Sequence, residues 1–126
     1  MSTYQCDKMI EGVKCCTTNA LYQIDKDRVI VGGFGECSIV NIDNEVIEGT
    51  LEDESMGYVN CYLKLRDNKT ILCGCDYGIF CFYNMSKGEY TITKGNHNES
   101  INDLLMIDCD TFISCSRDTT IKVWNY

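Results

Sequence analysis

Several residue types and patterns are missing from this chain of 126 residues. Proline is absent, and no long stretch rich in serine, glycine or proline marks a linker, so we expect a single domain over residues 1–126. No apolar run approaches the roughly 18 residues that a membrane span needs. Residues 1–10 lack the basic-then-apolar pattern of a signal peptide. We therefore expect a cytoplasmic protein without a membrane partner.

Basic residues are also few. Eleven Lys and Arg stand against nineteen Asp and Glu, which gives a net charge of −8. Binding to a phosphate backbone needs clustered cations, so we expect no nucleic-acid partner. The acidic stretch over residues 48–54 is expected to be a solvated loop, with docking of a basic peptide as the alternative.

Histidine occurs once, whereas cysteine occurs ten times. The pairs Cys15-Cys16 and Cys73-x-Cys75 do not have the usual spacing of zinc ligands, so we expect no metal and no cofactor. In a secreted chain so many cysteines would indicate disulfides. Without an export signal we expect reduced thiols packed as small apolar side chains in predicted strands, at Cys37, Cys61, Cys73, Cys81 and Cys115.

Patterns typical of catalysis are missing as well. The glycine-rich run of residues 32–35 joins two predicted strands and suits a tight turn rather than a phosphate loop that opens a helix. Acidic residues are frequent, but nothing pairs two of them into an acid/base site. We therefore expect a protein that is not an enzyme.

The most specific pattern lies in the last thirty residues, where four polar side chains have a fixed spacing. His97 precedes Ser114 by seventeen residues, Ser114 precedes Asp118 by four, and Asp118 precedes Trp124 by six. An indole only donates, a hydroxyl both accepts and donates, a neutral imidazole does both on different nitrogens, and a carboxylate accepts. These four groups can therefore be buried together as one hydrogen-bonded relay, which we interpret as structural. The alternative is an exposed loop histidine and a core tryptophan at a chain end.

This segment resembles one WD-repeat blade of a β-propeller, in which these four residue types form such a relay. Asn125 stands where the family usually has Asp, and Asn96 where it has Gly. A period of about 41 residues extends the resemblance to the whole chain, because Ser114-Cys115 aligns with Cys73-Gly74 and then with Gly32-Gly33. The relay motif itself is confined to the last third. In the other units the alignment places Phe82 and Ile42 where the last has Trp124.

The resemblance implies an all-β fold of three four-stranded antiparallel propeller blades. The predicted units are residues 13–51, 52–94 and 95–126, preceded by an outer strand within residues 1–12 that completes a last blade. Three blades cannot close a ring, since propellers have typically 4–8. We therefore expect assembly, with a head-to-tail dimer of six blades favoured. A fragment of a longer propeller and completion by another protein are the alternatives.

The resemblance also implies a scaffold that binds a protein or peptide of unknown identity. Family members contact partners through one face of loops. Asn19, Asn60 and Asn102 recur at one repeat position, either to bond their own turns or to form a ring that binds a peptide backbone. A purely structural assembly subunit is the competing function. The expected partner-binding face comprises Tyr58, Asn60, Asn19, Ser100, Asn102 and Arg117.

Overall fold

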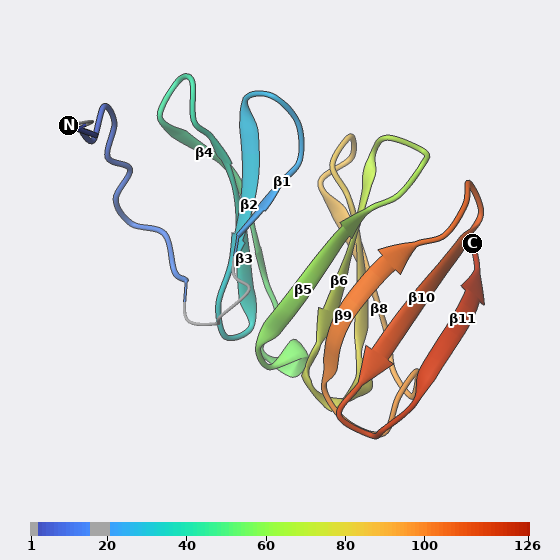
Figure 1. Cartoon of the computed structure of the whole chain (residues 1–126). Coiled ribbons are helices and arrows are strands. Elements are labelled where there is room, and N and C mark those ends of the chain that lie inside the picture. The colour runs from blue at the N-terminus through green and yellow to red at the C-terminus, as the bar shows by residue number, and fades with distance from the viewer. Residues whose placement is uncertain (1–2, 16–20) are drawn as a thin grey trace.

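The structure is a computed structural model that describes residues 3–15 and 21–126. Within these residues the chain is all β, with eleven strands in three antiparallel sheets and no α-helix. The sheets follow one another in chain order and lie side by side, with the second between the other two (Figure 1). The prediction of an all-β chain of repeated sheets is confirmed.

Each sheet is built from consecutive strands. The first has the order β1-β2-β3-β4, with bounds Leu21–Gln23, Arg28–Gly32, Glu36–Asn41 and Val46–Glu52. The second has the order β5-β6-β7-β8, with bounds Val59–Lys64, Thr70–Cys75, Phe80–Asn84 and Glu89–Thr93. The third has the order β9-β10-β11, with bounds Ile101–Met106, Thr111–Ser116 and Ile121–Asn125. Two short 3-10 turns, η1 (Glu54–Met56) and η2 (Asp76–Gly78), precede β5 and β7.

One hairpin turn recurs in all three sheets. Asp25, Asp67 and Asp108 each accept a backbone N–H from two or three residues further on, at 3.0, 2.9 and 3.2 Å. An aspartate that bonds nearby backbone in this way favours a turn over a continued strand. Since the three aspartates are 42 and 41 residues apart, they mark the repeat independently of its strands.

The strand ladders correct the predicted register of the first unit by one residue. β2, β6 and β10 begin 42 and 41 residues apart, so Gly32 is equivalent to Gly74 and not to Cys73. The cause is the turn between β5 and β6. It closes with a hydrogen bond from Leu65 N to Thr70 O, which spans one residue more than the bond from Ile24 N to Arg28 O in the first sheet. A shift of one residue moves a side chain to the other face of its sheet.

The same ladders correct the residues equivalent to Trp124. Trp124 lies opposite Phe112, as Tyr83 lies opposite Ile71. In the first sheet Val40 takes this place. Phe82 and Ile42, predicted from the sequence, are therefore displaced by one and two positions from it.

Apolar side chains fill the two spaces between neighbouring sheets. Ile30, Leu51 and Ile71 lie in the first space, and Leu72, Phe80 and Phe112 lie in the second. The cysteines predicted to be packed thiols are buried and free at Cys37, Cys61, Cys73 and Cys81. Burial raises the pKa of Cys61 to about 12, which keeps it protonated. Cys115 is only partly buried, because no further sheet covers its side of the third sheet.

The ends of the chain differ from the predicted blade pattern. The third sheet has three strands rather than four, and residues 3–12, predicted as an outer strand, form no strand. A strand needs a hydrogen-bonded neighbour, and the predicted neighbour is β11 of a second copy. In the single chain Lys8 Nζ instead donates to the backbone oxygens of Ile42 and Asp43 at 3.2 and 2.9 Å.

The acidic stretch over residues 48–54 is also not the loop that the sequence predicts. β4 extends to Glu52, so most of this stretch is strand. Among the described residues, no helix is long and apolar enough to cross a membrane.

Candidate functional site

The structure brings the four residues of the relay together in one chain of hydrogen bonds. Trp124 Nε1 donates to Ser114 Oγ at 2.8 Å, and Ser114 Oγ lies 2.7 Å from His97 Nε2. His97 Nδ1 lies 2.8 Å from Asp118 Oδ2. A neutral imidazole protonated on Nδ1 satisfies every group, because Nε2 then accepts the Ser114 proton. The relay spans β10, β11 and the loop before β9.

Thr120 is a further member of this site that sequence reasoning missed. Its hydroxyl donates to Asp118 Oδ1 and lies 3.1 Å from His97 Nδ1. Asp118 Oδ2 also accepts the backbone N–H of Asn98 at 3.0 Å. These hydrogen bonds, that of Thr120 first, hold the pKa of Asp118 well below its ordinary value. The signal in the sequence is only a threonine two residues after the aspartate.

Ser114, His97 and Asp118 have the hydrogen-bond connectivity of a nucleophile, a base and an orienting carboxylate. Their surroundings do not suit that chemistry. His97 is 2% exposed and Ser114 is 1% exposed, so a substrate carbonyl has no approach to Ser114 Oγ. That oxygen also receives the indole N–H, which competes with its use as a nucleophile. The arrangement therefore joins β10, β11 and the preceding loop.

Three residues of the predicted partner-binding face meet at Asp76, the first residue of η2. Its Oδ2 accepts the backbone N–H of Tyr58 at 3.0 Å. Its Oδ1 accepts from Asn60 Nδ2 at 3.1 Å and from Ser100 Oγ at 2.9 Å. Asp76 thereby ties the start of β5 to the segment before β9. Asp76 lies 42 residues before Asp118 in the sequence, close to the repeat period, but its role is this separate junction.

The remaining residues of the predicted face are placed differently. Arg117 is exposed, and its backbone N–H donates to Ser100 O at 3.0 Å. Asn102 is exposed on β9, with no side-chain hydrogen bond to the residues that the structure describes. Asn19 lies outside the described residues. Since Asn60 bonds Asp76 while Asn102 does not bond its counterpart, the two do not repeat one structural role.

Sequence reasoning missed two exposed aromatic residues close to Tyr58 and Asp76. Phe34 lies in the turn after β2 and packs edge-on against Tyr58, with ring centroids 5.0 Å apart. Tyr77, in η2, is 64% exposed and has a left-handed backbone with φ of 63°. Both stand next to glycines, at Gly33-Phe34-Gly35 and Tyr77-Gly78, which is the one signal that the sequence offered.

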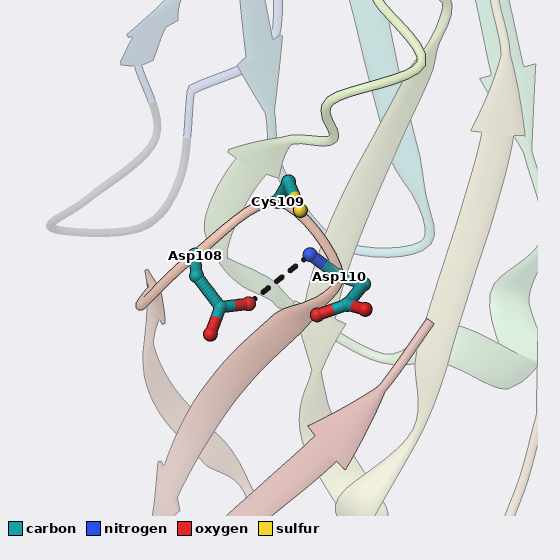
Figure 2. A group of neighbouring side chains, drawn as sticks. All are labelled: Asp108, Cys109 and Asp110. Atoms are coloured by element: carbon teal, nitrogen blue, oxygen red, sulfur yellow. Dashed lines mark hydrogen bonds between the residues drawn. The ribbon is translucent and has the colours of Figure 1, made fainter.

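One group of potential metal ligands occurs among the described residues. Asp108, Cys109 and Asp110 form the turn between β9 and β10, and all are exposed (Figure 2). A backbone N–H of Asp110 donates to Asp108 Oδ1, which lowers the pKa of Asp108 and accounts for the closeness of the two carboxyl groups. Hard cations take six or more oxygen ligands, which this turn does not assemble. It is the recurring hairpin turn described above.

No protein-family model and no curated protein matches the chain. Among solved structures, 474 chains match it. One of these is the crystal structure of the computationally designed Ika4 protein, which is 18% identical with a TM-score of 0.68. The match covers 83% of this chain and 63% of the designed one, so this chain spans only part of its length. At this identity the likeness shows a shared fold alone.

Proposed function

We propose that this chain is a non-catalytic scaffold of the WD-repeat β-propeller type, which binds protein partners after two copies close head to tail. The observation that carries the proposal is an apolar face of the third sheet, here called the open face. It comprises Leu105, Ile113, Cys115, Ile121 and Val123, the side chains directed away from the second sheet. The relay and the repeated strand order support the same family.

Equivalent positions show what the open face lacks. The ladders make Ile113 equivalent to Leu72 and Ile30, and both of these are fully buried by the next sheet. Phe80, equivalent to Ile121, is 2% exposed, whereas Ile121 is 69% exposed. Val123 and Leu105 are 67% and 60% exposed. An apolar cluster of this kind marks an interaction surface, and its periodicity fits a further sheet.

A second copy is the occupant that we propose. Among the described residues no strand pairs with the outer edge of β11, whereas β3 and β7 are each followed by a paired strand. In a head-to-tail dimer the N-terminal segment of one copy pairs with β11 of the other, so both edges are closed. Residues 3–15 run along the outer side of the first sheet (Figure 1), and closure requires them to leave it.

Size-exclusion chromatography of the full chain with light-scattering detection, combined with a substitution on the open face, tests this assembly. Val123→Ser removes apolar contact from the open face without changing a buried residue, so it should convert a dimer into a monomer. Val46→Ser, at an exposed valine on β4, is the matched control and should leave the dimer intact. A native chain that is monomeric at all concentrations would reject self-assembly. Aggregation of that monomer would favour a fragment of a longer propeller.

A further inference from the structure

Phe34, Tyr58 and Tyr77 form one exposed cluster, here called the aromatic surface, on the loop between β2 and β3, the segment before β5 and the turn η2 between β6 and β7. Their exposed fractions are 49%, 41% and 64%. Phe34 and Tyr58 form an isolated β-bridge and pack ring edge to ring face. Tyr77 lies against Gly57, where an added Cβ would be 2.9 Å from the Tyr77 ring. The three side chains therefore share one surface although they are distant in sequence.

The backbone beneath the aromatic surface is fixed by hydrogen bonds. Gly35 N donates to Gly57 O at 2.6 Å, and Asp53 N donates to Gly35 O at 2.8 Å. Asp76 Oδ2 accepts the N–H of Tyr58 at 3.0 Å. The rings are thus presented on a rigid base, which lowers the entropy lost when a partner binds.

Tyr77 is a costly choice of residue for its position. Its left-handed backbone is followed by a second positive φ, at Gly78. Two successive residues with positive φ are most often Asn-Gly or Asp-Gly. The short polar side chain of Asn or Asp can hydrogen-bond locally in this conformation, whereas an aromatic side chain cannot. An exposed aromatic residue held in a disfavoured conformation indicates a role outside the fold.

The three segments that form the aromatic surface carry acidic side chains and no basic ones. The segments 33–36, 53–58 and 76–78 carry four acidic residues and no lysine or arginine. Glu36 is paired with Lys14 at 2.9 Å, and the carboxylates of Asp53 and Asp76 accept hydrogen bonds from neighbouring residues, which leaves Glu54. Glu54 is exposed, and its Cα packs against Gly35, the residue after Phe34. A cationic side chain is complementary to this combination of π faces and carboxylates.

We propose that the aromatic surface binds an arginine side chain presented by a peptide segment of a partner protein. A planar guanidinium stacks on aromatic rings and donates in parallel to a carboxylate, here that of Glu54. This inference deepens the scaffold function proposed above by naming the chemistry of its partner. It involves none of the residues of the open face.

The experiment is a titration of the full chain with the blocked peptide Gly-Gly-Arg-Gly-Gly, in which changes in amide chemical shifts measure binding. The matched probe replaces arginine with citrulline, which keeps the shape but loses the charge. Citrulline should weaken binding about 2- to 5-fold or more, as loss of an exposed cation–π contact implies. Equal binding of the two peptides, or no binding of the arginine peptide, would overturn the proposal.

Two substitutions separate binding from folding. Tyr77→Asn suits the left-handed backbone, so the melting temperature should hold or rise while affinity for the arginine peptide falls. Glu54→Gln should also weaken binding. Tyr4→Asn, at a fully exposed tyrosine elsewhere, is the control and should change neither. Unchanged affinity in both Tyr77→Asn and Glu54→Gln would refute the site.

Light scattering of the same samples keeps the two proposals apart. A dimer that fails to bind the arginine peptide rejects only the aromatic surface as its site. A monomer that binds the peptide rejects only the self-assembly.

Discussion

The first three strands of the second sheet pair in the same way as the three strands of the third sheet, but the two sheets carry different side chains on their faces. Toward the preceding sheet, the second sheet presents apolar and thiol side chains such as Cys73 and Tyr83, whereas the third presents Ser114 and Trp124 of the relay. Toward the following sheet, the second buries Leu72 and Phe80, whereas the third exposes its open face. One backbone register therefore accepts either apolar packing or a satisfied polar network, and the uncovered face is the one on which the proposed self-assembly depends.

The largest expected effect compares one position in the two sheets. Phe80→Ala should destabilise the chain by about 3–5 kcal/mol, because Phe80 packs against Phe112 and Trp124 in a closed space. Ile121→Ala, at the equivalent exposed position, should change stability by under about 0.5 kcal/mol in dilute protein. Urea unfolding measures both values. Equal losses would mean that Ile121 is already covered in the single chain.

A second comparison concerns the space that a neighbouring sheet leaves. Gly32 faces Tyr62, and a Cβ added there would lie 1.9 Å from the Tyr62 hydroxyl oxygen. Gly32→Ala should therefore cost about 1–3 kcal/mol. Cys115→Ala, at the equivalent position on the open face, should be close to neutral.

The double variant Gly32→Ala/Tyr62→Phe identifies the cause of that loss. The Tyr62 hydroxyl is buried with no hydrogen-bond partner in residues 3–15 and 21–126, so Tyr62→Phe alone should be neutral or stabilising. In the double variant, Tyr62→Phe should recover part of the stability that Gly32→Ala loses, as measured by thermal unfolding. Strict additivity of the two changes would show that the predicted collision does not occur.

The relay can be compared with its apolar counterpart. Trp124→Phe removes the donor to Ser114 and should cost about 1–3 kcal/mol. Tyr83→Phe, at the equivalent position, should cost under about 0.5 kcal/mol, because its hydroxyl has no hydrogen bond to the described residues. Similar melting temperatures for the two variants would contradict a stabilising role of the relay.

The smallest expected effect is a pH dependence of the relay. The pKa of Asp118 in the folded chain lies below its ordinary value of 3.8, so its ionised form stabilises the fold above that pH. The contribution disappears as the pH falls below 3.8 toward the folded-state pKa. The stability difference between the native chain and Asp118→Asn should therefore shrink from about pH 6 to about pH 3. A constant difference would assign the effect of the substitution to packing instead.

The relay illustrates what the sequence alone predicts well. Four polar groups at fixed spacing limit the possible partners, so local pattern was enough to bring them together. The register of the first unit was not predictable in this way, because one extra residue in the turn between β5 and β6 makes Gly32 equivalent to Gly74 rather than to Cys73. The aromatic surface depends on the contact of Phe34 with Tyr58 and on Tyr77 lying against Gly57, which only the packing of two sheets creates.

The central claim is that two copies close head to tail, and the position of the N-terminal segment tests it most directly. A mixture of isotope-labelled and unlabelled full-length chains allows contacts between copies to be measured separately by filtered nuclear Overhauser effects. We predict contacts between residues 5–10 of one copy and β11 of the other. Contacts of Lys8 only with Ile42 and Asp43 of its own chain, as in the single chain, would contradict closure.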